Sequence, residues 1–386
     1  MMLSKRLSFV LVGSVVALAV WGAYTLSQSP SPDSFHARLN LSDVLSGDDA
    51  GYARAFEPRA FSFPADHGPH PTFKTEWWYY TGNLHTADGR RFGFQLTFFR
   101  SALSAEPVKR ASAWAAHQVF MAHFALSDIA SQRFYAFERF TRAAQNLAGA
   151  RGQPFRVWLE DWSAEATDDD ALPMRLSAAQ DGIAIDLTLH SAKPPVLQGD
   201  RGLSQKGPEP GNASYYYSLT RMPTQGTLQI GEQRFDVQGL SWMDREWSTS
   251  ALSRDQVGWD WFALQLDDGR EIMFYQLRQR DGDADPLSKG SLVQADGTAR
   301  LLTRDECLIE VLEHWQSPRS RVRYPSRWRI QIPTEQIELE VIPHIADQEL
   351  DVSIRYWEGA VRIQGTTRRQ PLTGHGYVEL TGYGEQ

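Results

Sequence analysis

The chain has 386 residues, which is long enough for two domains, and its composition of 42% hydrophobic and 22% charged residues is ordinary for a globular protein. Its net charge of −8 lacks the basic excess of a nucleic-acid binder, so no nucleic-acid partner is expected. The single cysteine, Cys307, excludes an internal disulfide and a cysteine-based zinc site.

The N-terminal segment carries a localisation signal. Lys5 and Arg6 precede an uncharged, largely apolar run over residues 7–26, which is just long enough to span a bilayer core. We predict that residues 1–27 form either a membrane anchor or a cleavable signal peptide, and that residues 28–59 form a linker. The positive end stays in the cytoplasm, so the body is expected in the cell envelope, either periplasmic or anchored to the outer face of the inner membrane.

From about residue 60 onward the pattern is that of β-strands. Phe92, Phe94, Leu96 and Phe98 alternate with small or polar residues, which predicts a half-buried strand after the Asp-Gly turn at 88–89. Similar short runs continue to the C-terminus at 122–127, 155–159, 183–190, 226–230, 271–277, 328–332, 337–342, 352–357 and 377–380. Many short strands with regular turns predict an all-β sandwich or barrel.

A faint internal repeat suggests two similar domains. The run Y-Y-T-G-N-L-H-T-A-D-G-R from Tyr79 matches W-D-W-F-A-L-Q-L-D-D-G-R from Trp259. Both contain an aromatic strand, an Asp-Gly-Arg turn and the start of a return strand. Asp-Gly turns also match by chance; if the repeat is real, the domains are residues 60–230 and 231–386.

Carboxylates set among tryptophans are the strongest chemical signal. Buried charges are rare unless they are paired, so two interpretations stay open. The acids either form a buried network with Arg245, or are kept protonated by desolvation in an aromatic pocket. A protonated carboxyl group could donate to an alkene or a leaving group while ring faces stabilise the cation. The candidate catalytic acids are Asp244, Glu246 and Asp260.

Other catalytic motifs are missing from the sequence. It contains no G-x-S-x-G, no H-E-x-x-H and no phosphate-binding loop, so we expect no metal and no cofactor. His123 lies on an apolar strand, where it is either a satisfied core histidine or a pocket residue. The residues expected to bind a ligand are Glu76, Trp77, Tyr79, His123, Trp242, Arg245, Trp247, Trp259, Trp261 and Tyr275.

Several long motifs carry a resemblance to a known family. E-W-W-Y-Y-T-G-N-L, A-H-F-A-L-S-D, G-L-S-W-M-D-R-E-W-S and G-Y-V-E-L-T-G-Y resemble the lipocalin-like proteins related to carotenoid 1,2-hydratase and AttH, many of which carry the label "predicted secreted hydrolase". The resemblance covers about residues 60–386. It implies two lipocalin-like antiparallel β-barrel domains with a pocket near their junction.

The family's hydratases add water to a terminal isoprenoid double bond, and its fungal relatives resemble pericyclic cyclases. Arg245 stands where the hydratases have a histidine, and Leu277 where they have an aspartate, which argues against carotenoid hydration itself. We expect an exported protein that binds a hydrophobic small molecule or lipid and acts on it by acid-catalysed hydration or hydrolysis. The alternatives are a carrier that hands its ligand to an ABC-type permease, and a structural envelope protein.

Overall fold

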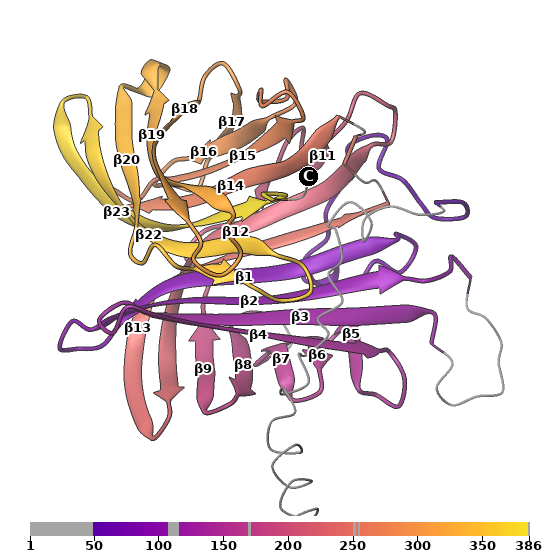
Figure 1. Ribbon diagram of the computed structural model, residues 1–386. Helices are drawn as coiled ribbons and strands as arrows, with labels where there is room; N and C mark the ends of the chain where they lie inside the picture. Colours follow the sequence, from indigo (N-terminus) through magenta and orange to yellow (C-terminus); the bar gives the residue numbers. More distant parts are fainter. Residues whose placement is uncertain (1–48, 107–115, 169–170, 250–251, 254, 385–386) are drawn as a thin grey trace, which may run out of the picture. The chain divides into compact units, whose positions relative to one another are not determined.

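The computed structural model describes residues 49–106, 116–168, 171–249, 252–253 and 255–384. Within these ranges the chain is all-β, with two antiparallel sheets (Figure 1) and two 3-10 turns, η1 (Ala65–His67) and η2 (Pro333–Glu335). The predicted N-terminal anchor or signal peptide, and most of the predicted linker, lie outside the described residues. No helix in the described ranges is long and apolar enough to cross a membrane.

The first sheet has 13 strands among the described residues, in the order β4-β3-β2-β1-β13-β12-β9-β8-β7-β6-β5, with β10 and β11 paired to β12. Its strands are β1 (Thr75–His85), β2 (Arg91–Ala102), β3 (Gln118–Asp128), β4 (Arg133–Arg142), β5 (Ala148–Gly152), β6 (Phe155–Leu159), β7 (Trp162–Ala166), β8 (Met174–Gln180), β9 (Ile183–Leu189), β10 (Val196–Leu197), β11 (Leu203–Gln205), β12 (Ala213–Ile230) and β13 (Gln233–Ser248).

The second sheet has 10 strands in the same described ranges, in the order β17-β16-β15-β14-β23-β22-β20-β19-β18, with β21 paired to β22. Its strands are β14 (Gln256–Leu266), β15 (Glu271–Gln279), β16 (Lys289–Val293), β17 (Ala299–Thr303), β18 (Leu308–Gln316), β19 (Arg323–Ile332), β20 (Ile337–Pro343), β21 (Glu349–Leu350), β22 (Tyr356–Thr367) and β23 (Gln370–Thr381).

The two sheets place the repeated runs at equivalent positions. β1, which holds the Tyr79 run, lies between β2 and β13, and β14, which holds the Trp259 run, lies between β15 and β23. The expected boundary near residue 230 falls at the tip of the β12–β13 hairpin, inside the first sheet. The chain changes sheet later, between Ser248 and Gln256, because β13 pairs with β1 along its C-terminal half.

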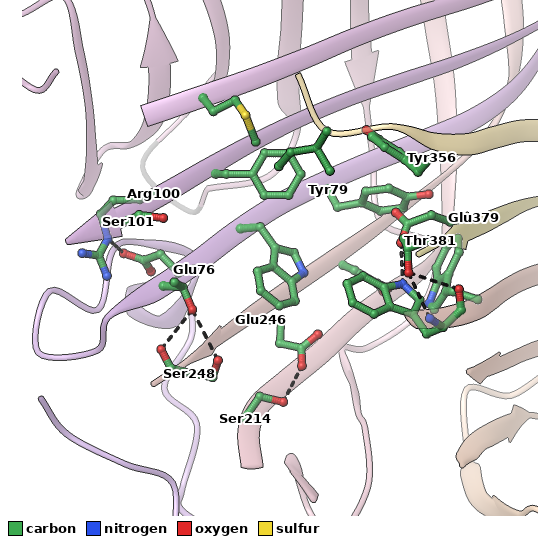
Figure 2. Close-up of a pocket in the computed structure, with 18 of the residues that line it drawn as sticks. Glu76, Tyr79, Arg100, Ser101, Ser214, Glu246, Ser248, Tyr356, Glu379 and Thr381 are labelled. Carbon is green, nitrogen blue, oxygen red and sulfur yellow. Dashed lines mark hydrogen bonds and ion pairs between the residues drawn. The ribbon is translucent and has the colours of Figure 1, made fainter. Parts of the chain in front are cut away.

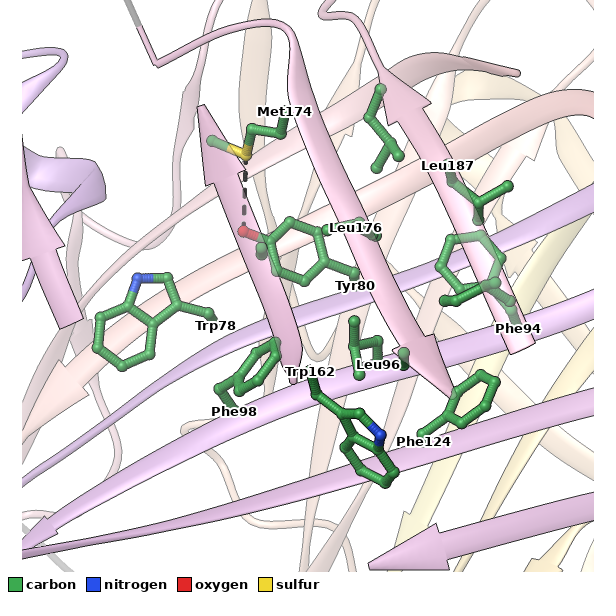
Figure 3. Packing of buried hydrophobic residues seen from close by; sticks show 14 of the residues in the cluster. Trp78, Tyr80, Phe94, Leu96, Phe98, Phe124, Trp162, Met174, Leu176 and Leu187 are labelled. Atoms are coloured by element: carbon green, nitrogen blue, oxygen red, sulfur yellow. Dashed lines mark hydrogen bonds between the residues drawn. The ribbon is translucent and has the colours of Figure 1, made fainter. Parts of the chain in front are cut away.

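Each sheet curls around its own apolar core. Phe124 of β3 and Trp162 of β7 are far apart in the strand order, yet their ring centroids are 5.7 Å apart (Figure 3). In the second sheet, Phe262 of β14 and Trp328 of β19 make the corresponding contact at 5.6 Å. The predicted all-β fold with two lipocalin-like, barrel-forming sheets is therefore confirmed.

Strand alternation explains the aromatic run in β1. Successive side chains of a strand point to opposite faces. Trp78 and Tyr80 fill the core of the first sheet (Figure 3), whereas Tyr79 packs in a cluster with side chains of the second sheet. At the edge of Tyr79, Trp261 of β14 makes a T-shaped contact with a centroid distance of 5.1 Å. The second face of this strand is thus used to join the two sheets.

One predicted strand is wrong. Residues 352–357 alternate in hydropathy, but only the last two belong to a strand, and 351–355 form the turn between β21 and β22. Ile354 belongs to a buried apolar cluster with Met121 of the first sheet, and Val352 packs against this cluster. Their burial comes from contact between the two halves, and this produces the same alternation as a half-buried strand.

A buried charge network links the two halves at Glu271. This carboxylate of β15 is 0% exposed and accepts hydrogen bonds from Lys193 at 2.8 Å, from Thr220 at 3.1 Å and from Arg221. All three donors belong to the first half of the chain. One interpretation of the sequence was a buried network between arginine and the acids near tryptophans. A buried network of this type does connect the two halves, but its acid is Glu271.

Cys307 should be chemically silent in the folded protein. It lies in the turn between β17 and β18, is 3% exposed, and burial raises the pKa of its thiol to about 12. We expect no reaction with an aromatic disulfide reagent in buffer at pH 8 and complete reaction in denaturant. The absorbance of the thiolate released from the reagent measures the reaction. Labelling of the native chain at the rate of an exposed thiol would contradict this burial.

Candidate active site between the two sheets

A cavity of about 350 Å³ lies between the two sheets (Figure 2). This volume is at the lower end of the range for small-molecule pockets. It reaches the surface at Leu103 and Phe140, which are 57% and 62% exposed. Most of the predicted site residues line it, and these are Glu76, Trp77, Tyr79, His123, Asp244, Glu246, Trp259, Trp261 and Tyr275.

Asp244 is the best placed of the predicted acids. Its Oδ1 accepts hydrogen bonds from Ser218 at 2.6 Å and from the indole N–H of Trp242 at 2.7 Å, and Oδ2 accepts one from the Tyr216 hydroxyl. Burial raises the pKa of Asp244 to about 7, which outweighs the three donors, and the nearby Glu246 adds to the rise. The carboxyl group can therefore exchange a proton near neutral pH.

Aromatic side chains of both sheets surround this acid. The Trp261 indole N–H donates to the Tyr216 hydroxyl at 3.2 Å, which joins the second sheet to the Asp244 network. The Trp242 and Trp261 rings meet edge to face, with a centroid distance of 6.3 Å. Ring faces in such a cavity can stabilise a cation that develops beside them.

Glu246 is paired with a lysine. Nζ of Lys206 lies 3.1 Å from Oε1 of Glu246, and the Ser214 hydroxyl donates to the same oxygen (Figure 2). Burial alone would lower the pKa of Lys206, but the charges of Glu246 and Tyr275 raise it instead, so the ammonium form persists. Glu246 therefore acts here as the partner of a cation, and the pair makes a polar end for the cavity.

The structure adds a second acid centre, which the sequence interpretation missed. Glu379 of β23 lines the cavity and accepts a hydrogen bond from the Trp259 indole N–H at 2.5 Å. Its neighbour across the strands is Glu358 of β22. Burial raises the pKa of Glu379 to about 7. The signal was available, because both acids lie among apolar and aromatic residues, as in Trp357-Glu358, which is the pattern that singled out Asp244.

His123 is hydrogen-bonded on both ring nitrogens. Nε2 lies 3.0 Å from a carboxylate oxygen of Glu138, and Nδ1 lies 2.7 Å from the hydroxyl of Tyr356. If Nε2–H donates to the carboxylate, Nδ1 accepts the proton of the Tyr356 hydroxyl, which also lines the cavity. The partner Tyr356 comes from β22, so this contact could not be read from the sequence.

Glu76 and Arg245 form an ion-pair network on the other face of the first sheet. Arg100 and Arg245 both donate to the Glu76 carboxylate, and all three side chains are buried. Burial would raise the pKa of Glu76, but the two guanidinium groups hold it well below its usual range. Glu76 reaches the edge of the cavity as an ionised carboxylate and is unsuited to act as a proton donor.

The structure does not bring four of the predicted residues to the cavity wall; they are Asp260, Trp242, Arg245 and Trp247. Strand alternation is the reason for Asp260, Arg245 and Trp247. Asp260 points away from Trp259 and Trp261, into the core side of the second sheet, where it pairs with Arg278 at 2.9 Å. Arg245 and Trp247 face away from Asp244 in the same manner. Trp242 is buried between the sheets and contributes through its hydrogen bond to Asp244.

These features define a class of protein: two curled antiparallel sheets of lipocalin-like type that enclose an aromatic cavity between them. A family model described as AttH-like matches residues 54–383, and the chain belongs to the AttH-like family. The crystal structure of an AttH protein from Nitrosomonas europaea is similar, with 36% sequence identity and a TM-score of 0.76 over 86% of this chain and 99% of that chain.

Two further similar proteins are fungal. Kievitone hydratase from Nectria haematococca shares the fold, with a TM-score of 0.65 and 16% identity over 87% of this chain and 97% of that chain. The dehydratase asqC from Emericella nidulans is 22% identical over 224 residues, which is 55% of this chain and 62% of the dehydratase. The match thus spans less than two thirds of that protein. Proteins similar to this chain therefore include a hydratase and a dehydratase.

Proposed function

We propose that this chain binds an apolar small molecule, of isoprenoid or lipid type, in the cavity between the sheets and adds water to it or removes water from it. The observation that carries the proposal is the pair of acid centres set in aromatic walls, since burial raises the pKa of both Asp244 and Glu379 to about 7. A carboxyl group with such a pKa can donate a proton at neutral pH and accept one in the next step.

The chemistry needs three things from the protein. One carboxyl group protonates an alkene carbon, or in the reverse direction the hydroxyl group that leaves as water. The faces of Trp259, Trp261 and Trp77 stabilise the resulting carbocation. A second carboxylate accepts the proton of the attacking water. The Lys206–Glu246 pair offers a polar group of the ligand a place to bind.

A carrier is the second candidate function. Leu103 and Phe140 line the cavity and are also exposed, so the rim of the cavity is apolar. Such a rim suits the transfer of an apolar ligand to a membrane protein, for example a permease of ABC type. An exported body, held at or near the outer face of the inner membrane by the N-terminal segment, belongs to the same proposal.

Native mass spectrometry of the full-length chain, purified under mild conditions, tests the proposal. We expect a co-purified apolar compound, released by solvent extraction. The chain is then incubated in ¹⁸O-labelled water with myrcene, an isoprenoid alkene, and with linalool, a matching tertiary alcohol. Label in an alcohol product, or loss of water from linalool, supports the enzyme. A bound ligand that is recovered unchanged supports the carrier, and an empty protein that takes up neither probe contradicts both.

A further inference from the structure

We propose that Glu358 and Glu379 form a carboxyl pair that stores the proton used in the reaction, with Glu379 as the catalytic donor and Glu358 as the residue that positions it. The inference rests on the proposed function and assigns its proton donor. It goes beyond the acids expected from the sequence, because neither glutamate was among them.

The backbone register places the two carboxyl groups side by side. Glu358 of β22 and Glu379 of β23 are directly opposed across the antiparallel pair, so their side chains leave the sheet on the same face. Glu358 is 0% exposed, and Glu379 lines the cavity (Figure 2). The two carboxyl groups are close enough for each to shift the pKa of the other. One carboxyl group therefore faces the substrate, and the other lies behind it.

This contact requires a proton. No N–H or O–H donor of the described residues reaches Oε2 of Glu358, although that atom is buried. A buried acceptor without a donor is costly, and two adjacent carboxylates cannot both be ionised at low cost. A proton on Glu358 that is donated to Glu379 removes both penalties. Burial, together with the neighbouring Glu379, raises the pKa of Glu358 well above its usual value.

Two hydrogen bonds from aromatic residues hold the pair in place. The Tyr79 hydroxyl donates to Oε1 of Glu358 at 2.5 Å, and the Trp259 indole N–H donates to Oε1 of Glu379 at 2.5 Å. Tyr79 belongs to the first sheet and Trp259 to the second, so the pair forms only where the sheets meet. The titratable groups that face the pair are Tyr79 from β1, Asp244 and Glu246 from β13, Tyr356 from β22 and Tyr377 from β23.

Asp244 on the opposite wall completes the proton balance. In hydration, the O–H bond of a protonated Glu379 breaks and its proton forms a C–H bond with the π electrons of the alkene, while Glu358 keeps its own proton and donates a hydrogen bond to the Glu379 carboxylate that results. The oxygen of a water molecule then forms a C–O bond to the cation, and the ionised Asp244 carboxylate takes the released water proton. Alkene and water become alcohol, and exchange with solvent returns the proton from Asp244 to Glu379. Dehydration follows the same steps in reverse.

Infrared spectroscopy tests the pair without any substrate. In the full-length chain at pH 8, we expect the carbonyl band of a protonated carboxyl group that shifts when glutamate is labelled with carbon-13. This band should be lost in Glu358→Gln and retained in Glu232→Gln, which alters an exposed turn residue. The label excludes any contribution from Asp244. A wild-type protein without a protonated glutamate at pH 8 would overturn the pair, whether or not the chain is active.

Turnover of the isoprenoid probes tests the donor role. We expect Glu379→Gln to lower the rate about 10²- to 10⁴-fold, the range for loss of a general acid. Glu358→Gln should instead move the pH–rate profile to higher pH, because Glu358 lowers the pKa of Glu379 by hydrogen bonding and a glutamine amide is a weaker donor than a carboxyl group. A Glu379→Gln variant with full activity overturns the donor role and leaves the proposed function intact. An inactive wild type that still shows the glutamate band overturns the proposed function and the donor role together.

Discussion

Glu76→Gln should destabilise the fold by about 3–5 kcal/mol, the cost of breaking a buried ion pair and leaving a charge unpaired. Here one carboxylate serves two buried guanidinium groups, those of Arg100 and Arg245. Glutamine preserves the size of the side chain and removes its charge. Urea unfolding of the full chain, followed by tryptophan fluorescence at pH 7, measures the change.

The pH dependence of this effect has a definite sign. The folded-state pKa of Glu76 is lowered from an ordinary value of 4.5, so its stabilisation is present above that value and is lost as pH falls below it. Wild type and Glu76→Gln should therefore converge in acid. Asp186→Asn is the control, since the Asp186–Arg175 pair is about half exposed and should contribute less than about 1 kcal/mol. Equal effects of the two substitutions would contradict the assigned role of Glu76.

Asp244→Asn should nearly abolish turnover while it stabilises the protein in alkaline solution. Burial raises the pKa of Asp244 from 3.8 to about 7, so its contribution to stability is present below the lower value and is lost as pH rises through the higher one. Asparagine carries no charge to desolvate and removes this dependence. We expect turnover to fall about 10²- to 10⁴-fold, with the urea midpoint of the variant above that of wild type at pH 9.

Asp260→Asn is the matched control for this prediction. Asp260 is also a buried aspartate next to tryptophans, but it pairs with Arg278 on the far side of β14. Its substitution should lower stability, because Arg278 loses its partner, and should leave turnover close to that of wild type. Loss of turnover in Asp260→Asn without loss of stability, or full activity in Asp244→Asn, would argue that the cavity acids have been assigned to the wrong face.

Part of the candidate site could be predicted from the sequence alone. Trp77, Asp244 and Trp259 could be selected because acids among aromatic residues are uncommon, and all three line the cavity. The same criterion also selected Asp260, since it ignores which face of a strand each residue occupies. It passed over Glu379, whose partner Glu358 lies on a neighbouring strand. Local composition identifies residues that are capable of acid–base chemistry, whereas the register of the strands decides which of these residues lie next to one another.

By itself, the sequence determined the local features of this protein. Alternation of apolar and polar residues predicted most of the strands, and the similarity of the Tyr79 and Trp259 runs indicated that β1 and β14 occupy equivalent positions in the two sheets. The aromatic run in β1 required that both faces of this strand be buried. These features depend on neighbours within a few positions, so pattern and spacing are sufficient to reveal them.

Only the tertiary structure decided the ionisation and pairing of the acids. Glu76 and Asp244 are buried, Glu379 is partly buried, and all three carboxyl groups lie beside tryptophans, yet the first has a lowered pKa and the other two have raised ones. The difference is set by groups that are distant in sequence: two arginines for Glu76, and desolvation between the sheets for the others. A pKa depends on burial and on charges within a few ångströms, and these distances exist only once the two sheets have packed together.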